Sequence, residues 1–510
     1  MKKSASFPLE SGEFIKNEAL LDKAMKCWES LSKFREERER CKRFTYGDQW
    51  QDFVYDRGVR MCEEDYIRSQ GNLPLKNNLI RRLVRNVMGV FRNQWHLPQC
   101  VARDPAEASR AATINLLLEY NMELNRLEEI YARTMEEYLI SGMAVHKKWF
   151  GLRGATSECV TDIVSPDRFF FDTSSRDFRG SDITMTGEIH HLDFESLFAA
   201  FARTPAWVKA LEGLCGARLF NSADDGAVFT VVEIWQKKPE KALRCLDRSS
   251  GRLFEVPFSM HEKLAGDHGG NLRIEILTVE RWHYHFLLST GEVLASGVSP
   301  YNHGSHPYVF KAYPYIDGEI HSFVSDIIDQ QKLTNRLISM YDWILRASAK
   351  GVLLFPEGSL PDGVDINDIA DEWSRFNGVI VYRPRPGVAL PQQVSSKSAD
   401  IGITQLLEIQ MKMMEDISGV NGALQGKLDN GSISGTLYDQ QTRNSLTALA
   451  DLLKSFEDFI RCGAMMEADN IRQFFSRRKI EAIVGERSGC SLDLKPTLRF
   501  RRSASDFKFV

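Results

Sequence analysis

Paired histidines are the residues of this chain whose spacing points most directly to chemistry. His283 and His285 stand two residues apart in a segment of strand-like composition, so their imidazoles share one face of the strand. His303 or His306 could supply a third ligand after folding, and three protein ligands beside an open position are typical of catalytic zinc. A metal-dependent hydrolase is therefore one alternative. Histidines beside aromatic residues on a strand are more typical of ordinary packing.

A second histidine pair is less suited to a metal. His190 and His191 are adjacent, so on a strand they point to opposite faces, and only His191 and Asp193 share one. Two ligands do not complete a site. The chain also lacks the GxSxG and HExxH signatures of common hydrolases, and its nine cysteines form no CxxC pair. We therefore expect no catalytic residue, no metal ligand and no cofactor in a protein that is not an enzyme.

A glycine-rich stretch over residues 419–435 resembles a phosphate-binding loop only superficially. In a Walker loop, four residues separate the first glycine from a Gly-Lys pair that Ser or Thr follows. Here Gly422 leaves three residues before Gly426 and Lys427, and the next residue is Leu428. The stretch also follows a helical pattern rather than a strand. Its glycines and its amide and hydroxyl side chains predict a polar loop between two long helices.

The pattern before this loop predicts a long helix and then a compact excursion. Residues 317–351 carry apolar side chains at three- and four-residue steps without a proline, which predicts an amphipathic helix about 50 Å long. Asp317 and Gly318 are expected to start it. Residues 352–398 contain five prolines, and the apolar runs 352–355 and 379–382 have the character of short strands.

Helical spacing returns on both sides of the glycine-rich loop. Residues 399–418 form the expected return helix, so the chain leaves along one helix and comes back along another. Residues 436–480 predict a very long helix whose leucines and phenylalanines mark a buried stripe, with Gly463 as a possible kink. Residues 481–510 end in an alternating pattern that predicts a strand.

The N-terminal part predicts helices followed by a β-rich region. Residues 18–44 have the alternating charges of a solvated helix, and residues 105–141 predict another helix. Between them, residues 44–50 (FTYGDQW) place aromatic residues around a Gly-Asp turn. Residues 160–310 contain several strand patterns separated by polar, glycine-containing turns. Together these patterns predict an α+β fold.

The helix expected over residues 73–95 separates its arginines from its apolar residues. The arginines are Arg81, Arg82, Arg85 and Arg92. Such a face can bind phosphates. The alternative is a solvated face whose arginines pair with nearby carboxylates.

Size and charge restrict the class of protein further. With 510 residues, the chain is long enough for about three domains. Its net charge of −4 provides no global attraction to nucleic acid, so any contact with DNA must be local or weak. No apolar run is long enough for a membrane span, and no secretion signal follows the first residues. We expect a protein that is made and used in a cytoplasm without a membrane partner.

The order of these elements resembles the portal proteins of tailed bacteriophages, particularly those of short-tailed phages. The similarity spans roughly residues 40–475. Several local segments agree with that family: Phe44-Thr-Tyr-Gly-Asp-Gln-Trp50, the helix over 78–93, Pro314 to Asp317, Ile417-Ser-Gly-Val420, Ser434-Gly-Thr436 and Gln440-Gln-Thr-Arg443. Head-to-tail adaptors, another class of ring, tend to be much smaller than this chain.

The resemblance implies a mainly helical portal fold with wing, stem and clip, assembled as a ring of usually about twelve subunits. Residues 1–316 and the helix over 436–480 would build the wing, with wing strands in 481–510. The stem helices would be 317–351 and 399–418, the clip 352–398 and the tunnel loop 419–435. The family commonly continues into a helical crown, so the resemblance implies either that the crown is absent here or that the chain is truncated before it.

The resemblance also implies partners and sites. The ring would occupy the unique capsid vertex of the virion after assembly in the host cytoplasm, and double-stranded DNA would pass through it during packaging and ejection. Terminase, the head-tail adaptor, the major capsid protein and a scaffolding protein would bind it. The tunnel-loop residues expected to touch DNA are Asn421, Gln425, Lys427 and Asn430. The stem residues expected to support assembly are Ile320, Phe323, Ile327, Leu337 and Ile344.

Overall fold

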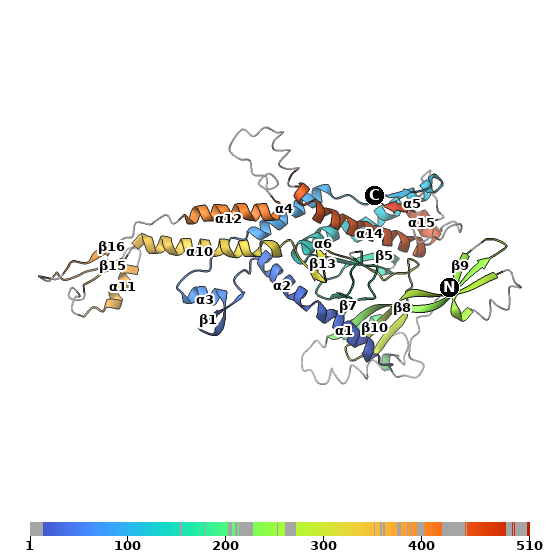
Figure 1. The fold of residues 1–510 in the computed structure, drawn as a ribbon, viewed down its shortest axis with the longest axis horizontal. Coiled ribbons are helices and arrows are strands. Elements are labelled where there is room, and N and C mark those ends of the chain that lie inside the picture. The colour runs from blue at the N-terminus through green and yellow to red at the C-terminus, as the bar shows by residue number, and fades with distance from the viewer. Residues whose placement is uncertain are drawn as a thin grey trace, which may run out of the picture. The chain divides into compact units, whose positions relative to one another are not determined.

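The computed structural model has a mixed α+β fold, as expected (Figure 1). Residue contacts divide the chain into two compact units. The first comprises Met1–Lys42, Leu83–Asp326 and Gly419–Val510, and the second comprises Arg43–Arg82 and Ile327–Ser418. The structure describes residues 14–153, 156–177, 179–201, 207–209, 213, 228–251, 253–260, 272–350, 352–356, 360, 363–374, 379–384, 386–387, 389–394, 402–420, 444, 446–485, 492, 494 and 507–509.

The helices of the described residues follow the amphipathic patterns of the sequence, with breaks at specific residues. They are α1 (Glu18–Ser30), α2 (Ser32–Tyr46), α3 (Glu63–Ser69), α4 (Leu79–Gln94), α5 (Ala108–Asn125), α6 (Leu127–Ser141), α7 (Phe194–Phe201), α10 (Ile328–Lys350), α11 (Ile366–Ser374), α12 (Ile403–Ser418), α14 (Ala450–Phe474) and α15 (Arg477–Val484). The helix expected over 105–141 is two helices, because Arg126 adopts a positive φ of 53° between α5 and α6.

The strands of the first unit form one large and one small antiparallel sheet. They are β4 (Met143–Arg153), β5 (Thr156–Ile163), β6 (Phe169–Phe171), β7 (Met185–Leu192), β8 (Phe229–Asp247), β9 (Leu253–Pro257), β10 (Leu272–Leu288), β11 (Val293–Val298) and β12 (Tyr308–Ala312). The large sheet has the order β11-β10-β8-β7-β6, with β9 also paired to β8, and the small sheet has the order β12-β4-β5. Residues 272–288, which lie in the region where several strand patterns were predicted, form one long strand. The strand expected near residue 507 is β17 (Phe507–Phe509), which pairs with β3 (Cys100–Ala102).

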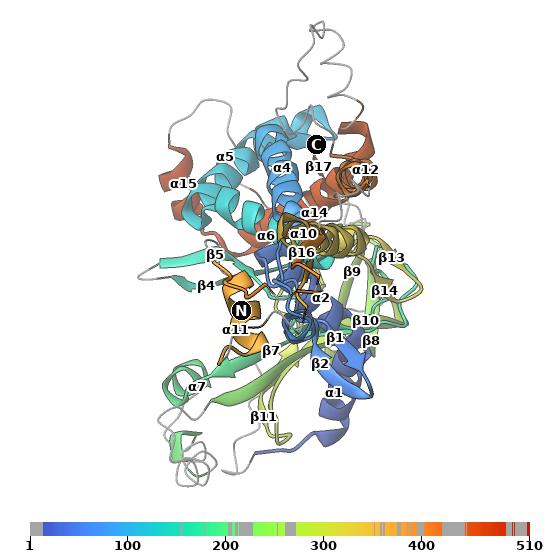
Figure 2. The same ribbon diagram turned by 90° about the vertical axis from the view of Figure 1, so that its left-hand side faces the viewer.

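Strand β4 divides the first unit into two cores because its side chains alternate between two faces. Met143 and Val145 pack into an apolar cluster with the strands of the large sheet and helix α1. On the other face, His146 and Phe150 contact Phe459 and Phe474 of α14. Figure 2 shows α5, α6, α14 and α15 grouped on one side of β4 and β5, and the strands of the large sheet on the other.

A buried ion pair joins α14 to β4. The side chains of Lys148 and Glu467 are only 2% and 3% exposed, and Lys148 Nζ lies 2.6 Å from Glu467 Oε2. Burial lowers the pKa of Lys148, but the adjacent Glu467 carboxylate outweighs burial and raises that pKa above its ordinary value. Asn121 donates a hydrogen bond to Glu467, and Lys148 donates one to the hydroxyl oxygen of Thr161. This pair makes α14 part of the core of its own unit.

Gly463 leaves space for the lysine of this ion pair and does not interrupt the helix. Helix α14 continues through Gly463, where a kink was considered possible. A Cβ atom at this position would lie 2.9 Å from Cε of Lys148, which is closer than carbon atoms pack. Glycine therefore allows the lysine side chain to pass the helix backbone.

The helix expected over 317–351 begins later than the sequence pattern indicated. Asp317 and Gly318 have φ angles of 52° and 85°, the conformation of a type I′ turn. This turn joins β13 (Tyr315–Ile316) to β14 (Glu319–Ile320) in a hairpin instead of starting a helix. A 3-10 turn (Ser325–Ile327) follows, and α10 starts at Ile328. With 23 residues, α10 is about 35 Å long rather than 50 Å.

Candidate assembly and DNA-channel site

Helix α10 of the second unit carries a row of buried polar side chains. Gln331, Asn335 and Ser339 are spaced four residues apart, so they lie above one another on one side of the helix. Gln331 Oε1 accepts hydrogen bonds from the backbone N–H groups of Leu79 (3.0 Å) and Ile80 (3.3 Å). These N–H groups lie at the start of α4, where a helix offers no backbone acceptor. The row therefore fixes the start of α4 against α10.

The same row holds the aromatic motif of the N-terminal region. Asn335 Oδ1 accepts a hydrogen bond from the N–H of Asn77 (3.1 Å), and its Nδ2 donates to Gln49 Oε1 (2.7 Å). Gln49 in turn donates to the carbonyl oxygen of Phe44 (2.8 Å). The Gly-Asp turn is thus a structural turn, and its glutamine connects two segments that are far apart in the sequence.

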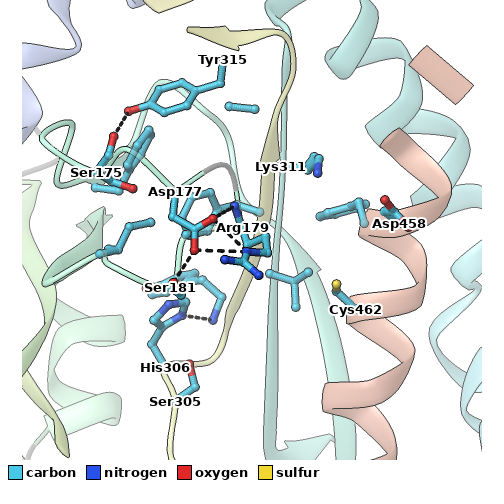
Figure 3. A pocket seen from close by; sticks show the side chains of 18 of the residues that line it. Ser175, Asp177, Arg179, Ser181, Ser305, His306, Lys311, Tyr315, Asp458 and Cys462 are labelled. Atoms are coloured by element: carbon cyan, nitrogen blue, oxygen red, sulfur yellow. Dashed lines mark hydrogen bonds and ion pairs between the residues drawn. The ribbon is translucent and has the colours of Figure 1, made fainter. Parts of the chain in front are cut away.

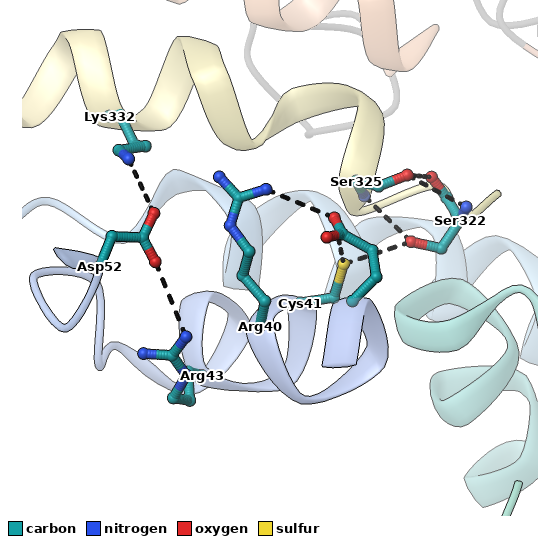
Figure 4. A network of polar contacts seen from close by, with 8 residues as sticks. Arg40, Cys41, Arg43, Asp52, Ser322, Ser325 and Lys332 are labelled. Atoms are coloured by element: carbon teal, nitrogen blue, oxygen red, sulfur yellow. Dashed lines mark hydrogen bonds and ion pairs between the residues drawn. The ribbon is translucent and has the colours of Figure 1, made fainter. Parts of the chain in front are cut away.

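A group of charged side chains flanks this row within the second unit. Asp52 lies 2.7 Å from Lys332 Nζ and 3.7 Å from Arg43 Nη2, as Figure 4 shows. Glu63 accepts two hydrogen bonds from the guanidinium of Arg336, at 2.6 and 2.9 Å. Both carboxylates are largely buried and paired, so the charges fix the small β1–β2 hairpin (Phe53–Asp56 and Val59–Cys62) and α3 against α10.

The C-terminal half of α10 is apolar around much of its circumference but is not covered by its own chain. Trp343 is 53% exposed. Other large apolar side chains of this helix are also exposed: Leu333, Met340, Tyr341 and Leu345. A helix that is apolar on several sides is normally buried. This segment therefore has more apolar surface than the second unit encloses.

Helix α12 also leaves apolar side chains exposed. It contacts α10, and Figure 1 shows the two helices side by side. Its exposed apolar side chains at helical spacing are Leu406, Ile409, Met413 and Ile417. The neighbouring Met414 is only 2% exposed, whereas Met413 is 47% exposed. One side of α12 thus belongs to the core of the second unit and the other faces away from it.

The excursion between these helices closes with a short strand pair. β15 (Val352–Leu354) pairs antiparallel with β16 (Gln392–Val394). The first expected strand, 352–355, is therefore present, but its partner is not 379–382, whose described residues form no strand. Helix α11 lies in between and was not expected from a segment with prolines on both sides.

The residues expected to act in assembly and DNA contact are placed as follows. Asn421, Gln425, Lys427 and Asn430 lie outside the described residues. Ile327 and Leu337 are buried within the single chain, and Ile344 is half-buried. Ile320 lies on β14 and packs against the first unit's large apolar cluster, while Phe323 is half-buried before the 3-10 turn.

The exposed apolar side chains of α10 were missed because only one stripe of the helix was considered. Met340, Tyr341 and Trp343 follow one another too closely to lie on a single face. That local crowding is a signal in the sequence that the helix has more than one apolar side.

The structure does not bring the candidate zinc histidines together. His283 Nε2 lies 2.8 Å from Glu240, and His285 Nε2 lies 3.2 Å from the ammonium of Lys238. Burial, and then Lys238, lower the pKa of His285 to about 4. His303 stacks on the ring of Tyr301, and His306 contacts Trp282 edge-on. Nothing in this arrangement supports the hydrolase alternative.

The other histidine pair also separates. His190 Nε2 lies 2.8 Å from the buried Glu233, and Glu188 lies close to both. The ammonium of Lys147 contacts Glu233 as well, so a protein cation already occupies this group of ligands. Burial raises the pKa of Glu233, but Lys147 and His190 outweigh it and lower that pKa to about 2. This cluster is a network of polar and charged side chains that connects β4, β7 and β8.

A cavity of about 630 Å³ lies in the first unit beside α14 (Figure 3). Phe171, Phe310 and Phe459 provide apolar walls. Its charged lining residues are Asp177, Arg179, Lys311, Asp458 and Arg461. Asp177 accepts hydrogen bonds from Arg179, and Arg461 pairs with Asp458, so the opposite charges largely compensate each other. The electrostatics of the cavity therefore select no class of ligand.

None of the helices in the described part of the chain combines the length and apolarity that a membrane span requires.

Comparison with known proteins identifies the class of this arrangement. The profile of the Phage P22-like portal protein family matches residues 21–492. No individual curated protein matches the chain. The family match covers both units, including α10, the β15–β16 pair, α12 and α14. It confirms the resemblance that the order of elements suggested, and the chain belongs to the Phage P22-like portal protein family.

Proposed function

We propose that this portal protein assembles into a closed ring and that the α10–α12 pair forms the stem of its DNA channel. The observation that carries this proposal is the apolar surface that α10 and α12 leave exposed in the second unit. In a ring of identical subunits, each copy covers such a surface on its neighbour. Full burial of one large apolar side chain contributes roughly 1.5–3 kcal/mol, so covering several of them can hold a ring together.

Family membership supports the general role. The chain acts as a phage portal protein, which serves packaging of the viral genome as a structural component rather than as an enzyme, and the family implies a place in the virion capsid. Within the proposal, the ring has about twelve subunits at one vertex. Its partners are double-stranded DNA, terminase, the head-tail adaptor, the major capsid protein and a scaffolding protein, and assembly takes place in the host cytoplasm.

The order of elements supports an assignment of each segment. Residues 352–398 form the clip, which presents β15, β16 and α11 to terminase and later to the adaptor. Residues 1–316 and 436–510 form the wing. Residues 419–435 form the tunnel loop, where Asn421, Gln425, Lys427 and Asn430 touch the phosphate backbone without reading bases.

The ring is tested by placing a charge on the exposed stem. Trp343→Glu should leave the chain folded but prevent assembly, because the carboxylate would have to be buried against the neighbouring subunit. Sedimentation velocity measures the oligomer, and circular dichroism reports the fold. Leu152→Glu, an exposed apolar position on β4, is the matched control and should assemble normally. Wild-type oligomers from Trp343→Glu would contradict the proposed stem interface.

The tunnel loop is tested separately. Lys427→Glu should impair DNA packaging and leave ring assembly intact, because it introduces repulsion between the loop and the phosphates. Lys23→Glu, at an exposed position of α1, changes the net charge equally and serves as the control. Normal packaging by Lys427→Glu would remove Lys427 from the proposed role.

A further inference from the structure

The exposed side of helix α4 concentrates positive charge without a carboxylate. α4 contains no Asp or Glu. At 100° per residue, its four arginines fall within an arc of about 100°. The opposite arc is buried and consists of Ile80, Leu83, Val84, Val87 and Phe91. The helix is therefore apolar on its core side and cationic on its outer side.

Three of these arginines have no partner among the residues that the structure describes. Arg82, Arg85 and Arg92 are exposed and take part in no described ion pair or hydrogen bond. Arg81 differs, because its guanidinium lies 4.9 Å from the ring centre of Tyr46. A solvated face with local carboxylate partners was the alternative interpretation of this helix, and these three side chains do not have such partners.

Three exposed arginines on other helices show a different arrangement. Arg68, Arg133 and Arg477 each pair with a glutamate four residues away on the same helix. Such pairs neutralise a surface arginine locally. The outer side of α4 lacks this neutralisation and keeps its positive charge available for a partner.

The composition of this side favours a phosphate polyanion over a protein partner. No large apolar side chain of α4 is exposed. Protein interfaces usually have an apolar centre, which this surface cannot provide. Its remaining exposed residues include Gly89 and Asn93, which are small or neutral and polar. Guanidinium groups bind phosphate oxygens in a bidentate geometry, and amides add further donors.

We infer that the outer side of α4 binds the phosphate backbone of double-stranded DNA independently of sequence. This inference rests on the portal function and adds a second contact to the tunnel loop. Arg85 and Arg92 are seven residues apart, about 10 Å along the helix axis, which is close to the ~12 Å width of the major groove. Because these side chains are exposed, each contact is weak and screened by salt, which suits DNA that must keep moving.

The test measures the salt dependence of DNA binding by the full-length chain. A short labelled duplex of mixed sequence is titrated with the wild type and with the triple variant Arg82→Gln, Arg85→Gln, Arg92→Gln. Each lost phosphate contact removes roughly 0.9 from the slope of log K against log salt, so the slope should become shallower by about 2 to 3. The affinity at ~0.1 M salt should fall at least about tenfold.

The matched control removes three charges that have local partners. Arg68→Gln, Arg133→Gln, Arg477→Gln changes the net charge equally and should retain the wild-type slope. Unchanged slope and affinity in the α4 variant would overturn the inference. So would an α4 variant that loses binding to polyglutamate but not to the duplex, because that result indicates an acidic protein partner.

Oligomer size, measured on the same samples, separates this inference from the ring proposal. A wild type that forms no ring contradicts the proposed assembly, whereas the slope per chain still tests α4. If the triple variant fails to fold, the single variant Arg85→Gln should reduce the slope by about 0.9, and Arg85→Lys should preserve it. An unchanged slope in Arg85→Gln would then overturn the inference.

Discussion

Helices α14 and α10 are both long and amphipathic, but they differ in how much of their surface is buried within the chain. α14 lies against β4 in the first unit and carries the buried Lys148–Glu467 ion pair. α10 lies in the second unit, and its most deeply buried polar side chains are neutral, such as Gln331. The far half of α10 keeps Trp343 and other apolar side chains exposed. The first helix is covered by its own chain, whereas in the proposed ring the exposed part of the second would be covered by other copies.

Buried charge occurs in both units, but both members of the α14 pair are more deeply buried than Lys332 and Arg336 of α10. A buried ion pair requires that both partners stay in place, because a single buried charge is costly. α14 meets this condition within one chain, since Glu467 also accepts a hydrogen bond from Asn121. On α10, the charged side chains lie at the edge of the row of neutral amides, where Lys332 pairs with Asp52.

The largest expected effect is at the ion pair. Glu467→Leu would leave Lys148 charged and unpaired in the core, and should lower the free energy of unfolding by about 3–5 kcal/mol. Chemical denaturation of the full-length chain measures this change. The double variant Lys148→Met, Glu467→Leu should recover most of the loss. A single variant that loses less than about 1 kcal/mol would show that α14 does not depend on this pair.

A smaller effect is expected at the amide row. Gln331→Ala removes the acceptor for the N–H groups of Leu79 and Ile80, and should cost about 1–3 kcal/mol in unfolding free energy. The same denaturation experiment applies. Gln405→Ala, at an exposed position of α12, is the control and should change stability by less than about 0.5 kcal/mol. Equal stability of both variants would remove the row from its structural role.

The smallest effect on the chain itself is expected on the exposed side of α12. Met413→Glu should change the unfolding free energy of the monomer by less than about 0.5 kcal/mol and still prevent ring assembly. Met414→Glu places the same charge one residue later, on the buried side, and should destabilise the chain strongly. Equal behaviour of the two variants would contradict the division of α12 into an inner and an outer side.

Local patterns in the sequence predicted the helices better than their exact starts. The return helix appeared close to its expected place, as α12, because its apolar spacing is regular. The start of α10 was placed too early, since Asp317 and Gly318 were interpreted as the start of the helix. Asp-Gly is a strong hairpin signal, and here it forms the turn between β13 and β14 instead of starting the helix.

Contacts between distant segments could not be predicted from local patterns. Nothing near Lys148 in the sequence indicates Glu467, which follows 319 residues later. The glutamine of the aromatic motif likewise gives no sign of its partner Asn335. The exposed apolar sides of α10 and α12 are harder still to interpret from one sequence, because in the proposed ring their cover would come from another copy of the chain.

Native mass spectrometry of the purified full-length chain, with negative-stain images of the same sample, tests the central claim most directly. The account predicts a closed ring with a central hole and a mass near about twelve times the 58.2 kDa of one chain. A chain that stays monomeric at every concentration, also after co-expression with a scaffolding protein, would contradict it.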